Sequence, residues 1–327
     1  MPEPLLQIRN LKVAFRTYGG RVQALDLHRL DVQPGEILGL VGETGSGKSM
    51  TALSILRLLD RKAEVESGEI IFQGEDLLKK SEVELRTIRG RRITMVFQDP
   101  MSSLNPVFPV GEPLVRIIAA HQQVSFRAAR QRALEMLALV RLPNPEKVLS
   151  AYPHELSGGM RQRVMIAMAL SSNPDLLLAD EPTTALDVTI QAQILRLIEE
   201  LRAHINASIV FITHNLGVVA RIADRVAVMY AGDVVETGST DDIFRHPGHP
   251  YTALLLQSIP RLGQKRDTLP VIEGTVPVVT HPQPGCYFYP RCPVRLERCQ
   301  FERPGWREQD HGHWVACWKS GPADAAE

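Results

Sequence analysis

Residues 42–49 read GETGSGKS, and this stretch decides the fold. It fits the pattern G-x-x-x-x-G-K-[S/T] at every fixed position. Residues 37–41 (ILGLV) read as a buried strand, and residues 48–59 read as a helix with few breakers. A strand, a glycine-rich loop and a helix in this order predict a phosphate-binding loop (P-loop) in an α/β fold. Its eight residues are Gly42, Glu43, Thr44, Gly45, Ser46, Gly47, Lys48 and Ser49.

The residue types in the P-loop suit a nucleoside triphosphate. Glycines let backbone amides cradle the phosphates, Lys48 can reach the β- and γ-phosphates, and the Ser49 hydroxyl can bind magnesium. From average composition, a chance match in a glycine-rich turn occurs roughly once per hundred chains of this size. The flanking strand and helix make chance rarer still, so we expect a nucleotide site.

A second phosphate-binding loop is predicted at residues 156–163, LSGGMRQR. Ser157, Gly158 and Gly159 precede an unbroken apolar run, residues 164–170, which suits a mostly buried helix. A serine hydroxyl, glycine amides and the positive end of a helix together form an anion site. One nucleotide does not need two such loops far apart in sequence. We therefore expect each loop to complete a nucleotide site on another subunit.

Two acidic residues end a short apolar strand at residues 176–179, LLLA. In a P-loop fold such a strand lies beside the nucleotide and presents its acids at its carboxyl end. Asp180 would hold magnesium, directly or through water, and Glu181 would polarise the attacking water. An ordinary acidic turn is the alternative for an isolated Asp-Glu-Pro sequence. The matched P-loop upstream favours the catalytic role.

Two polar residues follow other predicted strands. Gln98 comes after residues 93–97, and His214 comes after residues 208–213. An α/β sheet presents ligand-binding groups at such strand ends. A lone glutamine or histidine at a strand end more often has a structural role. The order of all the motifs along the chain therefore has to show whether Gln98 and His214 bind ligand.

This order resembles the ATP-binding cassette (ABC) family over roughly residues 5–240. It comprises the P-loop, Gln98, the LSGGMRQR loop, Asp180-Glu181, the sequence TALD at 184–187, and His214. In that family two cassettes pack head to tail, and each ATP lies between one P-loop and the partner's signature. The resemblance therefore implies ATP and Mg²⁺ as ligands and a second cassette as a partner.

The resemblance also implies a role for each matching residue. Residues 42–49 become the Walker A motif, residues 157–159 the signature, and Asp180 with Glu181 the Walker B motif and its catalytic glutamate. Gln98 becomes the Q-loop glutamine and His214 the switch histidine. The implied magnesium ligands are Ser49, Gln98 and Asp180.

Three positions leave room for variation within this resemblance. Phe15 would stack on adenine, although Tyr18 is close enough to compete. Met160 ends the signature where many cassettes have glutamine, and Asn215 follows the histidine where aspartate is common. Neither change removes a group that hydrolysis needs, so we expect both halves of the ATP site to be competent.

The expected fold is an α/β ABC cassette spanning residues 1–245. It would comprise a RecA-like core, an antiparallel β subdomain built from residues 5–41 and 68–75, and a helical subdomain at about 99–172. Within the last, residues 125–140 read as an amphipathic helix. Residues 246–327, which include a proline-rich linker, would form a small irregular cysteine-rich extension.

Composition excludes several classes of function. The 327 residues carry 37 basic and 37 acidic side chains, so no bulk charge favours nucleic acid. No apolar stretch reaches the ~18 residues that a membrane-spanning helix needs. The first residues lack the basic region and apolar core of a signal peptide. We expect a cytoplasmic protein whose membrane association comes through partners.

All four cysteines fall between positions 286 and 317, at Cys286, Cys292, Cys299 and Cys317. A cytosolic compartment disfavours disulfides because it keeps thiols reduced. Zinc accepts four thiolates, but zinc sites usually show close C-x₂₋₄-C pairs, which are absent from this sequence. An iron–sulfur cluster also takes four thiolates, with more varied spacing. His311 and His313 could substitute as ligands, although isolated histidines in a polar loop are more often solvated.

The cysteine segment resembles the carboxy-terminal region of dipeptide and oligopeptide importer ATPases, some of which hold a 4Fe–4S cluster on four cysteines so arranged. It implies an ATPase subunit at the cytoplasmic face of the inner membrane. The implied partners are two permeases, a second and distinct cassette, and an extracytoplasmic peptide-binding protein. Nickel, glutathione or another small solute remains an alternative cargo, since cargo is recognised elsewhere.

Two other kinds of ABC protein fit less well. A DNA-repair ATPase would carry a long coiled-coil insertion before the signature, and the gap from Gln98 to Leu156 is too short for one. A translation factor would usually carry two cassettes in one chain.

Overall fold

The computed structural model describes residues 3–18, 20–99, 103–184, 186–205, 207–259, 272–280 and 283–320. The chain forms two compact units, which are described separately below. Unit 1 combines Met1–Lys79 with Thr213–Glu327, and unit 2 is Lys80–Ile212. Much of the predicted proline-rich linker, including Pro260, Pro270 and Pro282, lies outside the described residues, as does Ala185 of the TALD sequence. The predicted boundary at 245/246 stays a prediction.

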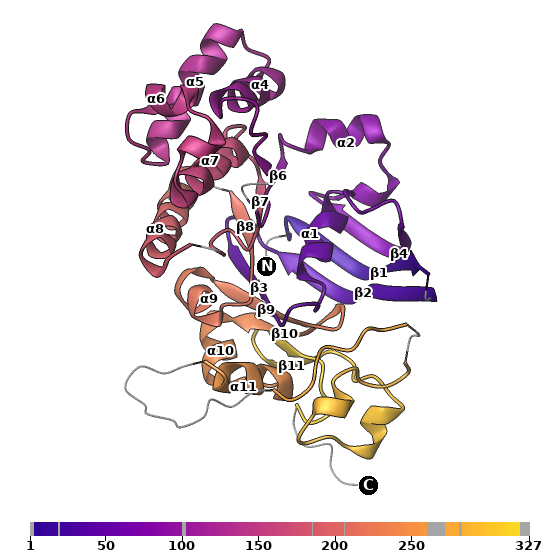
Figure 1. The fold of residues 1–327 in the computed structure, drawn as a ribbon. Helices are drawn as coiled ribbons and strands as arrows, with labels where there is room; N and C mark the ends of the chain where they lie inside the picture. Colours follow the sequence, from indigo (N-terminus) through magenta and orange to yellow (C-terminus); the bar gives the residue numbers. More distant parts are fainter. Residues whose placement is uncertain are drawn as a thin grey trace. The chain divides into compact units, whose positions relative to one another are not determined.

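Unit 1 contains the predicted antiparallel sheet (Figure 1), but residues 37–41, which were expected to belong to it, form a strand of the second sheet instead. Its strands, in spatial order, are β2 (Gly20–Val32), β1 (Leu6–Thr17), β4 (Ala63–Phe72) and β5 (Glu75–Asp76). Strand β1 buries Leu6, Ile8, Leu11 and Val13 completely. Alternation holds from Leu6 to Ile8 and again from Leu11 to Val13, and the shift by one residue between them coincides with a register irregularity at Asn10, whose φ is 48°.

The second sheet of unit 1 carries the P-loop. The parallel pair β3 (Ile37–Val41) and β9 (Arg225–Tyr230) is extended by the antiparallel strand β10 (Asp233–Ser239). Helix α9 (Leu216–Ile222) packs on β3, where a Cβ on Gly39 would lie 2.5 Å from Val219 Cγ1. The other helices of unit 1 are α1 (Lys48–Ile55), η1 (Leu77–Lys79), α10 (Thr240–Arg245) and α11 (Pro250–Gln257).

The cysteine-rich extension contributes to this second sheet. Strand β12 (His313–Val315) pairs with β10, and β11 (Arg307–Asp310) pairs with β12. Outside these strands, the described residues 283–320 consist of turns and two short 3₁₀ helices, η3 (Tyr289–Arg291) and η4 (Glu297–Gln300). The extension is therefore tied to the fold of unit 1 by backbone hydrogen bonds.

In its described residues, unit 2 contains three parallel strands in the order β8, β7, β6 and a group of helices (Figure 1). The strands are β6 (Ile93–Val96), β7 (Leu176–Asp180) and β8 (Ser208–Thr213). The helices are α2 (Glu82–Ile88), α4 (Gly111–Gln122), α5 (Phe126–Leu139), α6 (Pro145–Ser150), η2 (Pro153–Glu155), α7 (Gly158–Leu170) and α8 (Val188–Ile205). The amphipathic helix predicted at 125–140 is confirmed as α5, which Ser125 caps.

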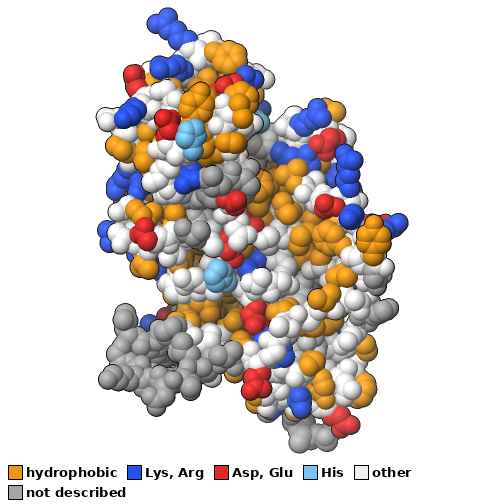
Figure 2. Space-filling view, in the orientation of Figure 1, with side chains coloured by type: hydrophobic (Ala, Val, Ile, Leu, Met, Phe, Trp, Pro, Cys, Tyr) orange, Lys and Arg blue, Asp and Glu red, His pale blue; other side chains and the backbone are white. Residues whose placement is uncertain are grey.

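Charges on the surface are mixed. Figure 2 shows Lys and Arg side chains scattered among Asp and Glu side chains over the face that it draws. In the part of the chain that the structure describes, no helix combines the length and apolar character needed to cross a bilayer.

Candidate nucleotide site and four-cysteine site

The P-loop leaves β3 at Val41 and enters α1 at Lys48. Three of its glycines have positive φ, namely 155° at Gly42, 83° at Gly45 and 106° at Gly47. These conformations favour glycine, because a Cβ would clash with the backbone. Since Gly47 is the N-cap and has no side-chain acceptor, the first amides of α1 are not capped from there. They can serve as donors to phosphate.

Lys48 lies across the P-loop. Its side chain is buried, and its Nζ donates to the carbonyl oxygens of Gly42 and Glu43, each at 2.8 Å. The Ser46 hydroxyl lies 3.3 Å from the same Nζ. The ammonium is therefore held over the loop that the sequence predicts to bind phosphate.

His214 and the P-loop line a common cavity within unit 1. Its volume is about 390 Å³, within the range of small-ligand sites. The cavity is lined by Gly42, Glu43, Thr44, His214, Leu216, Leu255, Gly274, Thr275 and Val276. The structure thus brings together two motifs that lie far apart in the sequence.

Asn215, the residue after His214, has a structural role at the start of a helix. Asn215 Oδ1 accepts from the amides of Gly217 and Val218, so Asn215 is the N-cap of α9. Asparagine serves this purpose as well as aspartate does.

Phe15 is half-buried on β1, whereas Tyr18 is fully exposed. The adenine-stacking role of Phe15 stays a prediction.

Gln98, Asp180 and Glu181 lie at the carboxyl ends of β6 and β7 in unit 2. Gln98 Nε2 donates to Glu181 Oε2 at 3.0 Å, and the Thr184 hydroxyl donates to the same oxygen at 2.9 Å. Glu181 has a φ of 45°, which non-glycine residues seldom adopt, and its amide donates to Ile212 O. Asp180 is buried beside it. The chain fixes this carboxylate at the cost of backbone strain, as functional sites often do.

The signature loop begins helix α7. Ser157 is the N-cap, and its Oγ accepts from the amide of Met160 at 3.3 Å. The predicted buried helix is confirmed, since every residue from Val164 to Leu170 is buried. A Cβ on Gly159 would lie 2.6 Å from Ile190 Cγ2, and one on Gly158 would lie 3.4 Å from Leu186 Cδ2. This close approach of α7 to the residues after β7 had no signal in the sequence.

The four cysteines line one small cavity, together with apolar residues that include Phe288 and Trp318. They are free thiols. Burial raises the pKa of the Cys286 thiol to about 11, and the neighbouring cysteines add to this shift. Burial also raises the pKa of the Cys292 and Cys317 thiols. A cation in the cavity would reverse this preference and favour thiolates.

Whether these thiols could bind a metal depends on how their sulfur atoms are arranged. Among the described residues, no three His, Cys, Asp or Glu side chains form a group that could hold a metal ion. A zinc ion would require all four sulfurs within bonding distance of one point. In a four-iron cluster each cysteine binds a different iron, so the sulfurs lie further apart. The four cysteines thus share a cavity, and the described residues present no metal-binding group there.

His313 does not belong to the cysteine site. It is buried, and its Nε2 lies 2.7 Å from Glu236 Oε1. Glu236 also accepts from the amides of Gly248 and His249, at 2.6 and 3.0 Å. The expectation that this histidine is solvated is wrong, because β12 carries it into the interior. His311 is exposed.

Sequence reasoning also missed two residues that contact the P-loop, Tyr251 and Arg291. The Glu43 amide donates to the Tyr251 hydroxyl at 2.9 Å, and Arg291 forms an ion pair with the Glu43 carboxylate. Burial raises the pKa of Tyr251, so its hydroxyl stays neutral. Both residues lie more than 200 positions from Glu43, and no local pattern links them to it.

Comparison with known protein families gives two matches along the chain. Residues 25–184 match the family described as ABC transporter, and residues 235–299 match the oligopeptide/dipeptide transporter C-terminal region. The second match covers part of the cysteine-rich extension.

Similar proteins include a probable peptide ABC transporter ATP-binding protein, y4tR, of Sinorhizobium fredii. It is 51% identical over 97% of this chain and 95% of its own length. The dipeptide transport ATP-binding protein DppD of Bacillus subtilis is 50% identical, with the same coverage. Among solved structures, the dimeric ATP-binding cassette MJ0796 bound to ADP and Pi has a TM-score of 0.65 at 28% identity. That match covers 72% of this chain and 98% of that chain.

Proposed function

Because this chain belongs to the family of ABC transporter ATP-binding subunits, we propose that it hydrolyses ATP to drive import of dipeptides or oligopeptides. The names of its relatives and the match of its C-terminal region support the peptide cargo. The structural observation that carries the ATPase function is the carboxylate of Glu181, held at the end of β7 by Gln98 and Thr184.

In this proposal, the P-loop binds the triphosphate of ATP. Its backbone amides and Lys48 hold the phosphates, and oxygen atoms of Ser49, Gln98 and Asp180 suit Mg²⁺, which prefers such ligands. The metal supplies charge neutralisation at the transferred phosphate. Glu181 orients and polarises the attacking water, and His214 contacts the γ-phosphate. Phe15 stacks on the adenine.

The signature of each cassette acts on ATP that its partner holds. Ser157, Gly158 and Gly159 present a hydroxyl and amides at the start of α7, where an anion is favoured. ATP then stabilises the closed pair, because only that state makes both contacts and a ligand shifts an equilibrium by its differential affinity. Hydrolysis resets the pair. The second cassette is a distinct homologue, and an isolated chain hydrolyses ATP poorly.

The remaining partners follow from the importer assignment. Two permeases span the membrane, a peptide-binding protein delivers cargo from outside, and this chain lies at the cytoplasmic face as a peripheral subunit. The four cysteines bind a 4Fe–4S cluster, for which their shared cavity supports the assignment. Anaerobically purified protein should then contain about four iron and four sulfide per chain. A colourless protein with one zinc would contradict the cluster.

The ATPase is tested with Glu181→Gln in the assembled transporter. We expect turnover to fall at least about 100-fold, because the polarising carboxylate is lost, while ATP still binds and ATP-bound cassette pairs accumulate. Turnover is measured by phosphate release and pairing by size-exclusion chromatography. The control is Glu135→Gln, which removes an exposed carboxylate of α5 paired with Arg132 and should leave turnover unchanged. Near-normal hydrolysis by Glu181→Gln would remove this residue from its role.

The cargo is tested by uptake in a strain that lacks this chain, with and without the restored gene. Labelled dipeptides, oligopeptides, glutathione and nickel are compared. Restored uptake of peptides alone supports the proposal. If only nickel or glutathione uptake were restored, the proposed ATPase activity would stand, but the proposed peptide cargo would be wrong.

A further inference from the structure

Arg291 of the cysteine-rich extension forms a two-pronged ion pair with Glu43, the second residue of the P-loop. Its two terminal nitrogens donate to the two carboxylate oxygens of Glu43 at 2.7 and 2.9 Å. The Arg291 side chain is only 7% exposed. Arginine is suited to this geometry, because its planar fork matches a carboxylate.

Arg291 is itself fixed by its surroundings. The guanidinium donates to the carbonyl oxygens of Ile272, Glu273 and Gly274, at 3.3, 2.8 and 3.3 Å. It also donates to the Tyr230 hydroxyl at 3.4 Å. All three guanidinium nitrogens thus donate hydrogen bonds. The ion pair therefore connects the P-loop to a side chain whose position is fixed by other contacts.

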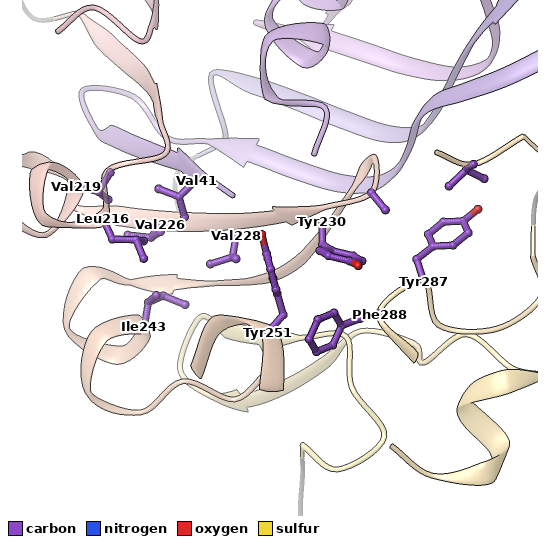
Figure 3. Close-up of a cluster of buried hydrophobic side chains, with 12 residues drawn as sticks. Val41, Leu216, Val219, Val226, Val228, Tyr230, Ile243, Tyr251, Tyr287 and Phe288 are labelled. Atoms are coloured by element: carbon purple, nitrogen blue, oxygen red, sulfur yellow. The ribbon is translucent and has the colours of Figure 1, made fainter. Parts of the chain in front are cut away.

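Glu43 is held through its backbone as well. Its amide donates to the Tyr251 hydroxyl, and the Tyr251 ring packs with Tyr230 and Phe288, with ring centroids 4.7–5.3 Å apart (Figure 3). The Glu43 carbonyl accepts from Lys48 Nζ. Glu43 is therefore a P-loop residue that contacts Tyr251 and Arg291 of the C-terminal part as well as the P-loop lysine.

We propose that Arg291 is a positioning residue for nucleotide binding, acting through Glu43. It holds the P-loop in its phosphate-binding conformation and neutralises a carboxylate that would otherwise repel the phosphates. This inference rests on the proposed function, because it takes the P-loop as the site of ATP. The extension thereby contributes to the ATP site of the same chain.

The matched control is the ion pair of Arg303 with Asp26. It also joins the extension to the rest of unit 1, at 2.6 Å, and Arg303 lies over the Tyr287 ring. It does not involve a P-loop residue. Arg291→Gln and Arg303→Gln therefore each remove an ion pair that joins the extension to the rest of unit 1, and only the ion pair of Arg291 fixes Glu43.

The test measures the dissociation constant of a fluorescent ATP analogue for the full chain, alongside iron content and the urea midpoint. We expect Arg291→Gln to weaken binding about 5-fold or more, the lower end of typical coupling between sites. Arg303→Gln should change binding less than about 2-fold, and binding is measured under conditions in which the urea curves show both variants to be folded. In the assembled transporter, Arg291→Gln should raise KM for ATP with little change in kcat.

A double-mutant cycle with Glu43→Gln tests the route. If the effects of Glu43→Gln and Arg291→Gln on ATP binding were independent, their changes in binding free energy would add. The double variant should bind ATP at least about 3-fold more tightly than this sum predicts, because it no longer carries the Glu43 carboxylate that Arg291→Gln alone leaves unpaired. Equal binding losses in the two arginine variants, or additive losses in the cycle, would overturn the inference. If the wild-type chain bound no ATP, the proposed function would fail instead.

Discussion

The P-loop and the signature loop both lead into a helix, yet their glycines serve different purposes. Gly42, Gly45 and Gly47 of the P-loop have positive φ. Gly158 and Gly159 of the signature belong to the first turn of α7. The P-loop needs glycine for its backbone conformation, whereas the signature needs glycine at Gly159 because the chain after β7 approaches α7 closely there.

The two helix starts also differ in how their amides are used. At α1 the N-cap is a glycine, which has no side chain that could accept from the first amides. At α7 the hydroxyl of Ser157 accepts from the Met160 amide. The P-loop is held by distant partners, Tyr251 and Arg291, whereas the signature is held by local ones. We would expect such a difference if, as proposed, the P-loop binds ATP of its own chain and the signature binds ATP of a partner.

The largest effect that separates the two loops is expected at Gly42. A Cβ there would lie 2.2 Å from the Met229 carbonyl oxygen, which is backbone and cannot move cheaply. We expect Gly42→Ala to lower the free energy of unfolding by about 3 kcal/mol or more and to abolish ATP binding. Urea unfolding and nucleotide titration measure these effects.

Gly45→Ala is the control for backbone conformation alone. Gly45 has positive φ, but a Cβ there meets nothing within 4 Å. We expect a loss of about 1 kcal/mol. Equal losses at Gly42 and Gly45 would mean that the contact with Met229 does not matter.

A smaller effect is expected in the signature, where contact and not φ decides. Gly159→Ala should cost about 1–2 kcal/mol, because its Cβ would press against the Ile190 side chain, which can shift partly. Gly158→Ala should change stability by less than about 0.5 kcal/mol, since its Cβ would make an ordinary contact. Thermal unfolding compares the two. A larger loss of stability for Gly158→Ala than for Gly159→Ala would mean that the close contact lies at Gly158 and not at Gly159.

An effect on stability smaller than that at Gly159 is expected at Ser157. Ser157→Ala should cost about 1 kcal/mol through loss of the N-cap. Ser125→Ala, which removes the same kind of cap from α5, should cost as much. Only Ser157→Ala should also lower turnover of the paired cassettes, by about 10-fold, because a hydroxyl to the phosphate is lost. If both variants kept full turnover, Ser157 would act only as a cap.

The motifs of the nucleotide site could be predicted because their residues are consecutive or follow strands in a fixed order. The strand before the P-loop, the strand before Asp180 and the helix after Gly159 lie where the sequence places them. Periodicity and glycine spacing are local properties, and local properties can be read from one chain. The cysteines likewise indicated one site by their clustering.

Contacts between distant residues could not be predicted in the same way. The buried carboxylate of Glu236 accepts from Gly248 and His249 and contacts His313. Nothing in the sequence around Glu236 identifies His313 as its partner. The same holds for Glu43 and Arg291. Such pairs depend on how β12 and η3 pack, which one sequence does not specify by pattern alone.

The ion pair between Glu43 and Arg291 also bears on synthesis of the chain. The ribosome adds Arg291 248 residues after Glu43, so the P-loop is made early and completed late. Unit 2 is continuous in sequence and can reach its own contacts while the C-terminal residues are still being added. A nascent chain that stops before Arg291 carries the whole Walker A sequence without this ion pair. Tight ATP binding would then be a property of the finished polypeptide.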